Sequence, residues 1–250
     1  MPKELVLRKQ DLFTNPTARI AVCLVLDRSP SMSGDPTLGA PTLQVNPRPI
    51  DELNSGVKQL FDELREDPIT LHSAEIAAVA FSGDAHAITD FQSLSRTTTP
   101  RVEIDQGYGG TSLGSGVSLA LDLLEQRKQE YVQSGVDYYQ PWIIIMTDGY
   151  PTDNSHFPAA ERTQLLTAKR KLVVFSVAVG IAADLNVLAM FATADRPPMR
   201  MRSMAFKPFF EWLSQSVHRV SQSAPGDGVP LPPTDAWRDP TSPDGDWKDV

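Results

Sequence analysis

The amino-acid sequence predicts an α/β fold with a doubly wound, mostly parallel central sheet, helices on both faces and one antiparallel edge strand. Apolar runs such as 20–26 and 141–148 are typical of strands that are buried on both faces of a parallel sheet. Helical patterns lie between most of these runs, as in βαβ units. The run 85–91 follows the strand expected at 74–81 after a Ser-Gly-Asp turn, which favours a hairpin partner at the sheet edge.

The helices follow from the spacing of apolar residues. The segment from Pro49 to Asp67 has apolar residues at i+3 and i+4 spacing, with proline at its start and just beyond its end. A second helix is expected from Leu113 to about Gln133, again with one apolar face. The later elements are a helix at about 157–170, a strand at 171–179, a helix at 183–193, a short strand at 199–203 and a final helix at 205–221.

Composition limits the class of protein. The 250 residues, 41% of them hydrophobic, suit one globular domain with a sizeable core. A net charge of −8 argues against a nucleic-acid-binding surface, which needs a basic stripe. No apolar run approaches the roughly 20 residues of a membrane span, and the opening MPKELVLRKQ has no cleavable signal pattern. The single cysteine, Cys23, favours a reducing compartment, so we expect a cytoplasmic protein.

Three regions organise the chain. Residues 1–18 are a lead-in, 19–222 form the domain, and 223–250 are a tail with six prolines and six aspartates. That composition predicts a disordered or loosely docked tail, although Trp237 and Trp247 would alternatively anchor it in a groove. The stretch from Gly34 to Arg48 is longer than a routine connection of about 2–6 residues. It is either a loop that shapes the neighbouring site or a mobile insertion.

The first apolar run leads directly into a possible metal site. Asp27, Ser29 and Ser31 follow it at spacing i, i+2, i+4, where open α/β folds bind ligands. An extended turn would aim one carboxylate and two hydroxyls at one point, and such hard oxygen donors suit a divalent cation. Each residue is also an ordinary turn or N-cap residue, so the pattern alone leaves both interpretations open.

Two later residues extend this pattern. Thr111 follows a glycine-rich loop just before a predicted helix, and Asp148 ends the run 141–148. Singly, Thr111 is most simply an N-cap and Asp148 a turn residue. Together with the three residues of the first loop, they are less easily explained as turn signals.

These motifs resemble the metal-ion-dependent adhesion site (MIDAS) of the von Willebrand factor A (VWA) domain family. The matching elements are D-x-S-x-S at 27–31, the glycine-preceded Thr111 and the T-D-G aspartate Asp148, and the resemblance covers about 19–221. The sequence looks most similar to bacterial VWA proteins associated with tellurite resistance (TerY-like). The stretches that carry this similarity are NPTARIAVCLVLD, PIDELNSGVKQLFDEL, SAEIAAVAF, GVDYYQPWIIIMTDGYPTD and KPFFEWLSQSV.

The resemblance implies a function as well as a fold. In the family the hydroxyls matching Ser29 and Ser31 hold the metal, while the equivalents of Thr111, Asp27 and Asp148 bind it directly or through water. Mg²⁺ is the expected ion, with Mn²⁺ or Ca²⁺ as alternatives. Its exchangeable position would take an Asp or Glu of a protein partner, such as a kinase or metal-dependent phosphatase of the same stress-response system. The rim that we expect the partner to touch is formed by Arg28, Gly110, Gly149 and Tyr150.

Two other functions are weighed against this one. A magnesium-dependent phosphohydrolase similar to the haloacid dehalogenases would need D-x-D, but the i+2 position is Ser29 and lacks a proton-transfer group. The sequence also lacks G-x-S-x-G and the Walker A pattern. The third possibility is a metal-independent scaffold that uses the tail or the 34–48 loop. The sequence favours a non-catalytic, metal-dependent interaction module.

Overall fold

A computed structural model describes residues 11–15, 17–34, 46–105, 109–242, 246–247 and 249–250. Six strands form one sheet in the order β3-β2-β1-β4-β5-β6. All neighbouring strands are parallel except β2 and β3, which are antiparallel. This architecture confirms the predicted fold class. The strands are β1 (Ile20–Asp27), β2 (Ala74–Phe81), β3 (Ala85–Thr89), β4 (Trp142–Thr147), β5 (Val173–Ala178) and β6 (Met199–Arg200).

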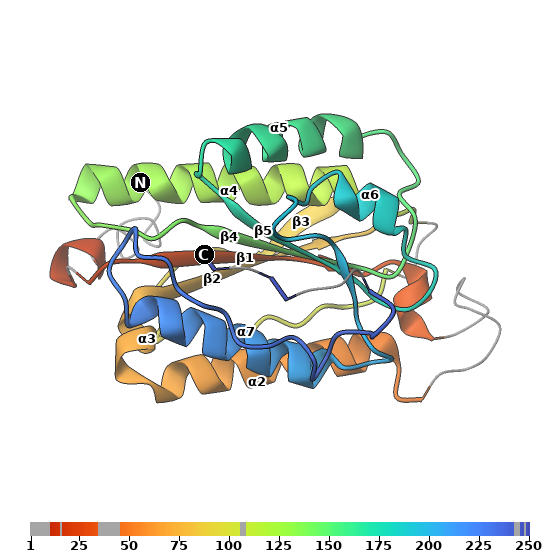
Figure 1. Ribbon diagram of the computed structural model, residues 1–250, viewed down its shortest axis with the longest axis horizontal. Coiled ribbons are helices and arrows are strands. Elements are labelled where there is room, and N and C mark those ends of the chain that lie inside the picture. Colours follow the sequence, from red (N-terminus) through yellow and green to blue (C-terminus); the bar gives the residue numbers. More distant parts are fainter. Residues whose placement is uncertain (1–10, 16, 35–45, 106–108, 243–245, 248) are drawn as a thin grey trace.

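Strand β1 divides the core into two layers because its side chains alternate between the faces of the sheet. Its even-numbered residues from Ile20 to Leu26 face α2 (Pro49–Glu66) and α7 (Phe206–Ser221). Ala21, Cys23 and Val25 face α4 (Leu113–Ser134) and α5 (His156–Ala168). Figure 1 shows these two helical layers on opposite sides of the sheet. Burial raises the pKa of the Cys23 thiol, so this cysteine is a packing residue and not a nucleophile.

Several element boundaries differ from the prediction. Helix α6 covers only Leu185–Ala189, and β6 is two residues long. A further short helix, α3 (Pro68–Ser73), follows α2 directly. The Asp67–Pro68 pair ends α2 as predicted, but it also begins α3. The Asp67 carboxylate accepts a hydrogen bond of 2.7 Å from the Thr70 amide, and Pro68 suits the first helical position.

The C-terminal segment is packed and not the disordered tail that its composition predicts. Among its described residues, Trp237 and Trp247 are 0% and 3% exposed. The Trp247 ring lies 4.8 Å from that of Phe175 on β5 and 5.2 Å from that of Trp212 on α7. Two large aromatic side chains bury enough apolar surface to order a segment that is otherwise rich in proline and aspartate. The alternative that these tryptophans are anchors is the one the structure favours.

The same segment also covers the β6 edge of the sheet. The Arg202 amide donates to the Trp237 carbonyl at 2.7 Å, and the Asp239 amide donates to the Arg200 carbonyl at 2.9 Å. Further along, Val229 and Val250 exchange backbone hydrogen bonds of 2.9 and 3.2 Å. Backbone groups at this edge are therefore paired within the chain and do not invite pairing with another molecule.

A buried ion network joins α4 to the start of the sheet. The Arg127 guanidinium donates two hydrogen bonds of 2.6 Å to the Glu75 carboxylate, and the Tyr131 hydroxyl donates a third. Arg19 lies 3.4 Å from the same carboxylate. Burial alone would raise the pKa of Glu75, but Arg127, Tyr131 and Arg19 more than offset it, so the pKa lies below its ordinary value of 4.5.

Two sequence predictions fall mainly outside the described residues. Residues 1–10, which contain the opening segment, and residues 35–45, which make up most of the 34–48 loop, are not described. The roles expected of them stay predictions. Within the described part of the chain, no helix has the length and hydropathy to span a bilayer.

The buried network gives the first testable prediction. Glu75→Gln would remove one of the two carboxylates that pair with the buried Arg127 and leave only Glu130. We therefore expect a loss of about 3 kcal/mol in the free energy of unfolding, measured by urea denaturation at pH 7. Glu66→Gln at the exposed end of α2 should change it by less than about 0.5 kcal/mol.

The pH dependence has a definite sign. Because the pKa of Glu75 is lowered in the folded state, its stabilising contribution is present above pH 4.5 and is lost as the pH falls through the folded value. The difference between wild type and Glu75→Gln should therefore shrink on acidification. A difference that grows at low pH would contradict this assignment.

The packed C-terminal segment gives a second prediction. Trp247→Ala removes a buried indole from the cluster with Phe175 and Trp212, and should destabilise the protein by about 3–5 kcal/mol. Val132→Ala, at a position that is 67% exposed, is the control. Equal denaturation midpoints for the two variants would show that the segment contributes nothing to the core.

Candidate metal centre

Three loops meet at the carboxyl ends of the central strands. Asp27 is the last residue of β1, Asp148 directly follows β4, and Thr111 precedes α4. Strands β1 and β4 pair in register as far as Leu26 and Met146, so their ends lie together. In Figure 1, the short helix η1 that follows β1 marks this end of the sheet, at the right. This is where parallel α/β sheets bind ligands.

A continuous chain of hydrogen bonds joins four of the five predicted ligand residues. The Asp27 carboxylate accepts from the Ser29 amide at 2.8 Å. The Ser29 and Ser31 hydroxyl oxygens lie 2.9 Å apart, and the Ser31 hydroxyl donates to the Asp148 carboxylate at 2.6 Å. The structure thus brings together Asp27, Ser29, Ser31 and Asp148 as the sequence predicts.

The local backbone that achieves this differs from the predicted extended turn. Pro30 to Ser33 form the 3₁₀ helix η1, with Pro30 at its first position and Gly34 closing it in the left-handed conformation, at φ 66°. In an extended chain, Ser31 would lie about 13 Å along the backbone from Asp27, at roughly 3.3 Å per residue. The tight turn brings Ser31 back toward Ser29 and across to Asp148.

Thr111 approaches the site from the other side. A Cβ on Gly149 would lie 3.3 Å from the Thr111 hydroxyl oxygen, which places that hydroxyl against the turn containing Asp148. It makes no hydrogen bond to the other four predicted ligands, all of which are described. The backbone of Thr111 is fixed by Thr152, whose hydroxyl accepts from the Thr111 amide at 2.9 Å. A return bond of 3.2 Å runs from the Thr152 amide to the Thr111 carbonyl.

Two supporting residues were not among the predicted site residues. A Cβ at position 110 would lie 2.0 Å from the Thr152 hydroxyl oxygen, so only glycine fits there. The Thr147 hydroxyl donates to the Asp27 carboxylate and accepts from the Gly149 amide at 3.2 Å. Both threonines flank the predicted ligand Asp148, in the stretch T-D-G-Y-P-T. Their proximity in sequence was the available signal.

The two carboxylates of the site carry unbalanced negative charge. Burial and, after it, the charge of Asp27 together raise the pKa of Asp148 to about 7. Burial also raises the pKa of Asp27, against the hydrogen bonds that Ser29 and Thr147 donate to it. Two acids and three hydroxyls are the oxygen donors that hard divalent cations prefer, and a charge of +2 would balance the two carboxylates. The donor set therefore fits a divalent metal ion.

The four predicted rim residues differ in their positions and contacts around these five side chains. Arg28 turns toward the β2–β3 turn, where its guanidinium lies 2.6 Å from the Asp84 carboxylate and 3.9 Å from that of Asp105. Tyr150 is 60% exposed beside the site. Gly110 and Gly149 are the glycines that pack against Thr152 and Thr111. Contact of any of the four with a partner stays a prediction.

The comparisons with known proteins agree with this geometry. The model of the von Willebrand factor type A domain matches residues 21–211, and the chain belongs to this family. No curated protein matches the sequence significantly.

Several solved structures share the fold. BatB from Bacteroides thetaiotaomicron is 18% identical with a TM-score of 0.55, covering 82% of this chain and 100% of that one. The PilB minor pilin from Streptococcus sanguinis is 16% identical with a TM-score of 0.55, covering 82% and 62%. Proximal thread matrix protein 1 from the mussel byssus, in a structure with a zinc-occupied MIDAS motif, is 16% identical with a TM-score of 0.53, covering 82% and 49%. This chain thus spans about half the length of the mussel protein, and such low identities show the fold alone.

The donor set leads to a direct test of metal binding. Isothermal calorimetry with Mg²⁺, Mn²⁺, Ca²⁺ and Zn²⁺ should detect one bound ion per chain, and Asp148→Asn should weaken it at least tenfold because one of two charged ligands is lost. Asp122→Asn, whose side chain is 66% exposed on α4, should change the affinity by less than twofold. If wild type takes up none of the four ions, the site is not a metal centre.

Proposed function

We propose that this protein is a non-catalytic, metal-dependent protein-interaction module. The observation that carries the proposal is the convergence of five oxygen-donor side chains, only two of them charged, from three loops at one end of the sheet. Four of these donors are Asp27, Ser29, Ser31 and Asp148, which form one hydrogen-bonded chain. The fifth, Thr111, lies against the turn after β4.

The balance of charge supports binding of an acidic partner. Ser29, Ser31 and Thr111 would contribute neutral oxygens, and Asp27 and Asp148 would contribute the only two negative charges. A divalent cation held there would supply an electrophilic position that a carboxylate from another protein can fill. The exposed Tyr150 beside the site provides surface for further contact with that protein.

The hydrogen bonds of the two serines argue for a binding role and not for catalysis. The Ser29 hydroxyl is paired with that of Ser31, and the Ser31 hydroxyl donates to Asp148. Among the described residues neither hydroxyl is hydrogen-bonded to a histidine, so the Ser–His pair of a serine hydrolase is not formed here. The residue two positions after Asp27 is a serine, so the acid/base carboxylate of a D-x-D phosphohydrolase is missing.

The finer features of the function rest on sequence resemblance. We propose Mg²⁺ as the ion, and a partner in a bacterial tellurite or stress-response system, such as a protein kinase or a metal-dependent phosphatase. The long stretches similar to proteins of that system, including residues 49–64 and 135–153, are the support. A cytoplasmic location is part of this proposal, supported by a single cysteine that is buried in the core.

The proposal predicts that partner binding needs both the metal and the hydroxyls. Immobilised protein is incubated with a bacterial lysate in Mg²⁺ or in EDTA, and captured proteins are compared by mass spectrometry. We expect a partner that binds at least tenfold more in Mg²⁺ and that is lost in Ser31→Ala, because this serine links the first loop to Asp148. In the partner, one Asp or Glu should be essential.

Ser95→Ala, a hydroxyl deletion at an exposed position distant from the three loops, is the matched control and should retain the partner. If wild type in EDTA and the Ser31→Ala variant in Mg²⁺ both capture as much partner as wild type in Mg²⁺, the interaction is not bridged by a metal. Phosphatase activity that is lost in Asp27→Asn would replace it with the hydrolase alternative.

A further inference from the structure

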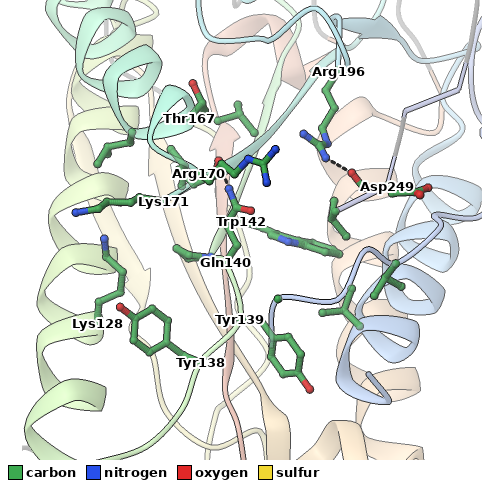
Figure 2. A pocket seen from close by; sticks show the side chains of 18 of the residues that line it. Lys128, Tyr138, Tyr139, Gln140, Trp142, Thr167, Arg170, Lys171, Arg196 and Asp249 are labelled. Carbon is green, nitrogen blue, oxygen red and sulfur yellow. Dashed lines mark hydrogen bonds between the residues drawn. The ribbon is translucent and has the colours of Figure 1, made fainter. Parts of the chain in front are cut away.

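A second candidate site lies at the opposite end of the sheet from the metal centre. A groove of about 1300 Å³ opens where β4 and β5 begin, and the residues around Trp142 and Leu172 form its floor. Its walls are the last turns of α4 and α5 on one side and residues 226–229 and 249–250 on the other. Figure 2 shows the groove with its lining side chains.

Basic side chains from separate elements reach into this groove. Arg170 comes from the end of α5, and Arg196 comes from the segment before β6. In Figure 2 their guanidinium groups point toward one another across the groove, and Lys128 and Lys171 stand along the wall formed by α4 and α5. Guanidinium groups that converge repel each other unless an anion lies between them.

Both arginines have guanidinium N–H groups that no described protein atom accepts. Among the described residues, the Arg170 side chain has no hydrogen-bond or ion-pair partner. The Arg196 guanidinium donates one bond to the Asp249 carbonyl, yet its Nε is buried without a partner. A buried guanidinium N–H that lacks an acceptor is unfavourable, and this applies to the Arg196 Nε, whereas Arg170 is exposed. Both planar groups match the oxygens of phosphate or carboxylate.

The backbone of Arg170 gives an independent indication. Arg170 has a φ of 52°, the left-handed conformation that ends α5. The bonds from the Lys171 amide to the Leu166 carbonyl, and from the Arg170 amide to the Thr167 carbonyl, both 2.9 Å, define the cap. Glycine is the preferred residue at this position, and an arginine there costs stability. An unfavourable residue that presents an unpaired cation to a groove indicates a role in binding.

Four acidic residues line the groove: two are engaged with other groups, and Asp195 and Asp249 lie close enough to Arg196 to attract its charge. Glu125 pairs with Lys128 at 2.8 Å, and the Asp227 carboxylate accepts from the Ala224 amide at 2.9 Å. The Asp249 carboxylate lies on the side of that residue away from Arg170 in Figure 2. The space between the Arg170 and Arg196 guanidinium groups is the cationic part of a groove that acidic residues also line, and Lys171 points away from it toward α4.

We propose that this groove binds a small oxyanion ligand with at least two anionic groups, either a phosphate ester or a polycarboxylate. Arg170 and Arg196 bind the oxyanion groups by paired N–H donors. Gln140 and Tyr138 provide further polar lining of the groove. This site is separate from the metal centre and does not depend on the proposed function.

Calorimetry with inorganic pyrophosphate and with citrate tests this proposal and separates the two ligand sources. Both probes chelate divalent ions, so the titrations are made in EDTA at constant ionic strength. We expect at least one probe to bind wild type with one site per chain. Arg170→Gly should weaken that binding at least tenfold while its thermal midpoint stays equal or rises, because glycine suits the left-handed position. If Arg170 had only a structural role, Arg170→Gly would not weaken binding while leaving the thermal midpoint equal or higher.

Arg196→Gln provides a second variant, and it should also weaken binding at least tenfold. Lys207→Gln, which removes an exposed cation from α7 outside the groove, is the matched control and should change affinity by less than twofold. Binding of pyrophosphate alone would assign a phosphate ligand, and binding of citrate alone a polycarboxylate. Failure of both probes to bind, equal binding by Arg170→Gly, or an equal loss in Lys207→Gln would overturn the proposal.

Discussion

Two acidic side chains held together away from water set the conditions for the rest of the site. Asp27 and Asp148 follow adjacent parallel strands, and the register of β1 with β4 leaves them no alternative positions. Burial and mutual repulsion raise the pKa of Asp148, so the ionised pair needs a counter-charge. The described groups around them do not supply a cation. They supply hydroxyl and amide donors that orient the carboxylates and leave their charge unbalanced.

The hydroxyl groups reach these acids through tight backbone geometry. Ser31 arrives by the 3₁₀ turn that Pro30 begins. Thr111 arrives because Gly110 leaves space for Thr152, which then holds the Thr111 backbone with two hydrogen bonds. A Cβ on Gly110 would clash with the Thr152 hydroxyl at 2.0 Å and push these loops apart. The arrangement is thus a rigid set of neutral and charged oxygens, which is what metal-dependent docking requires.

The C-terminal segment connects the stability of the core with the groove at the other end of the sheet. Trp237 and Trp247 complete the apolar layer beneath β5 and α7, where the helices leave the sheet partly uncovered. Residues 226–229 and 249–250 of the same segment then form one wall of the groove. Acids converge at the carboxyl ends of the strands, whereas both acidic and basic residues line the groove near their beginnings.

The sequence by itself determined the fold class, the order of the main strands and helices, and the set of residues proposed as metal ligands. These features depend on local apolar periodicity and on short motifs, and Asp27, Ser29 and Ser31 lie within one such motif. Tertiary structure alone decided that Ser31 bonds to Asp148, that Thr152 supports Thr111, and that Arg170 faces Arg196. It also decided that Trp237 and Trp247 are buried. The first three contacts join residues that are far apart in the chain. The burial of the tryptophans depends on how much apolar surface other elements leave uncovered. Local residue spacing specifies neither feature.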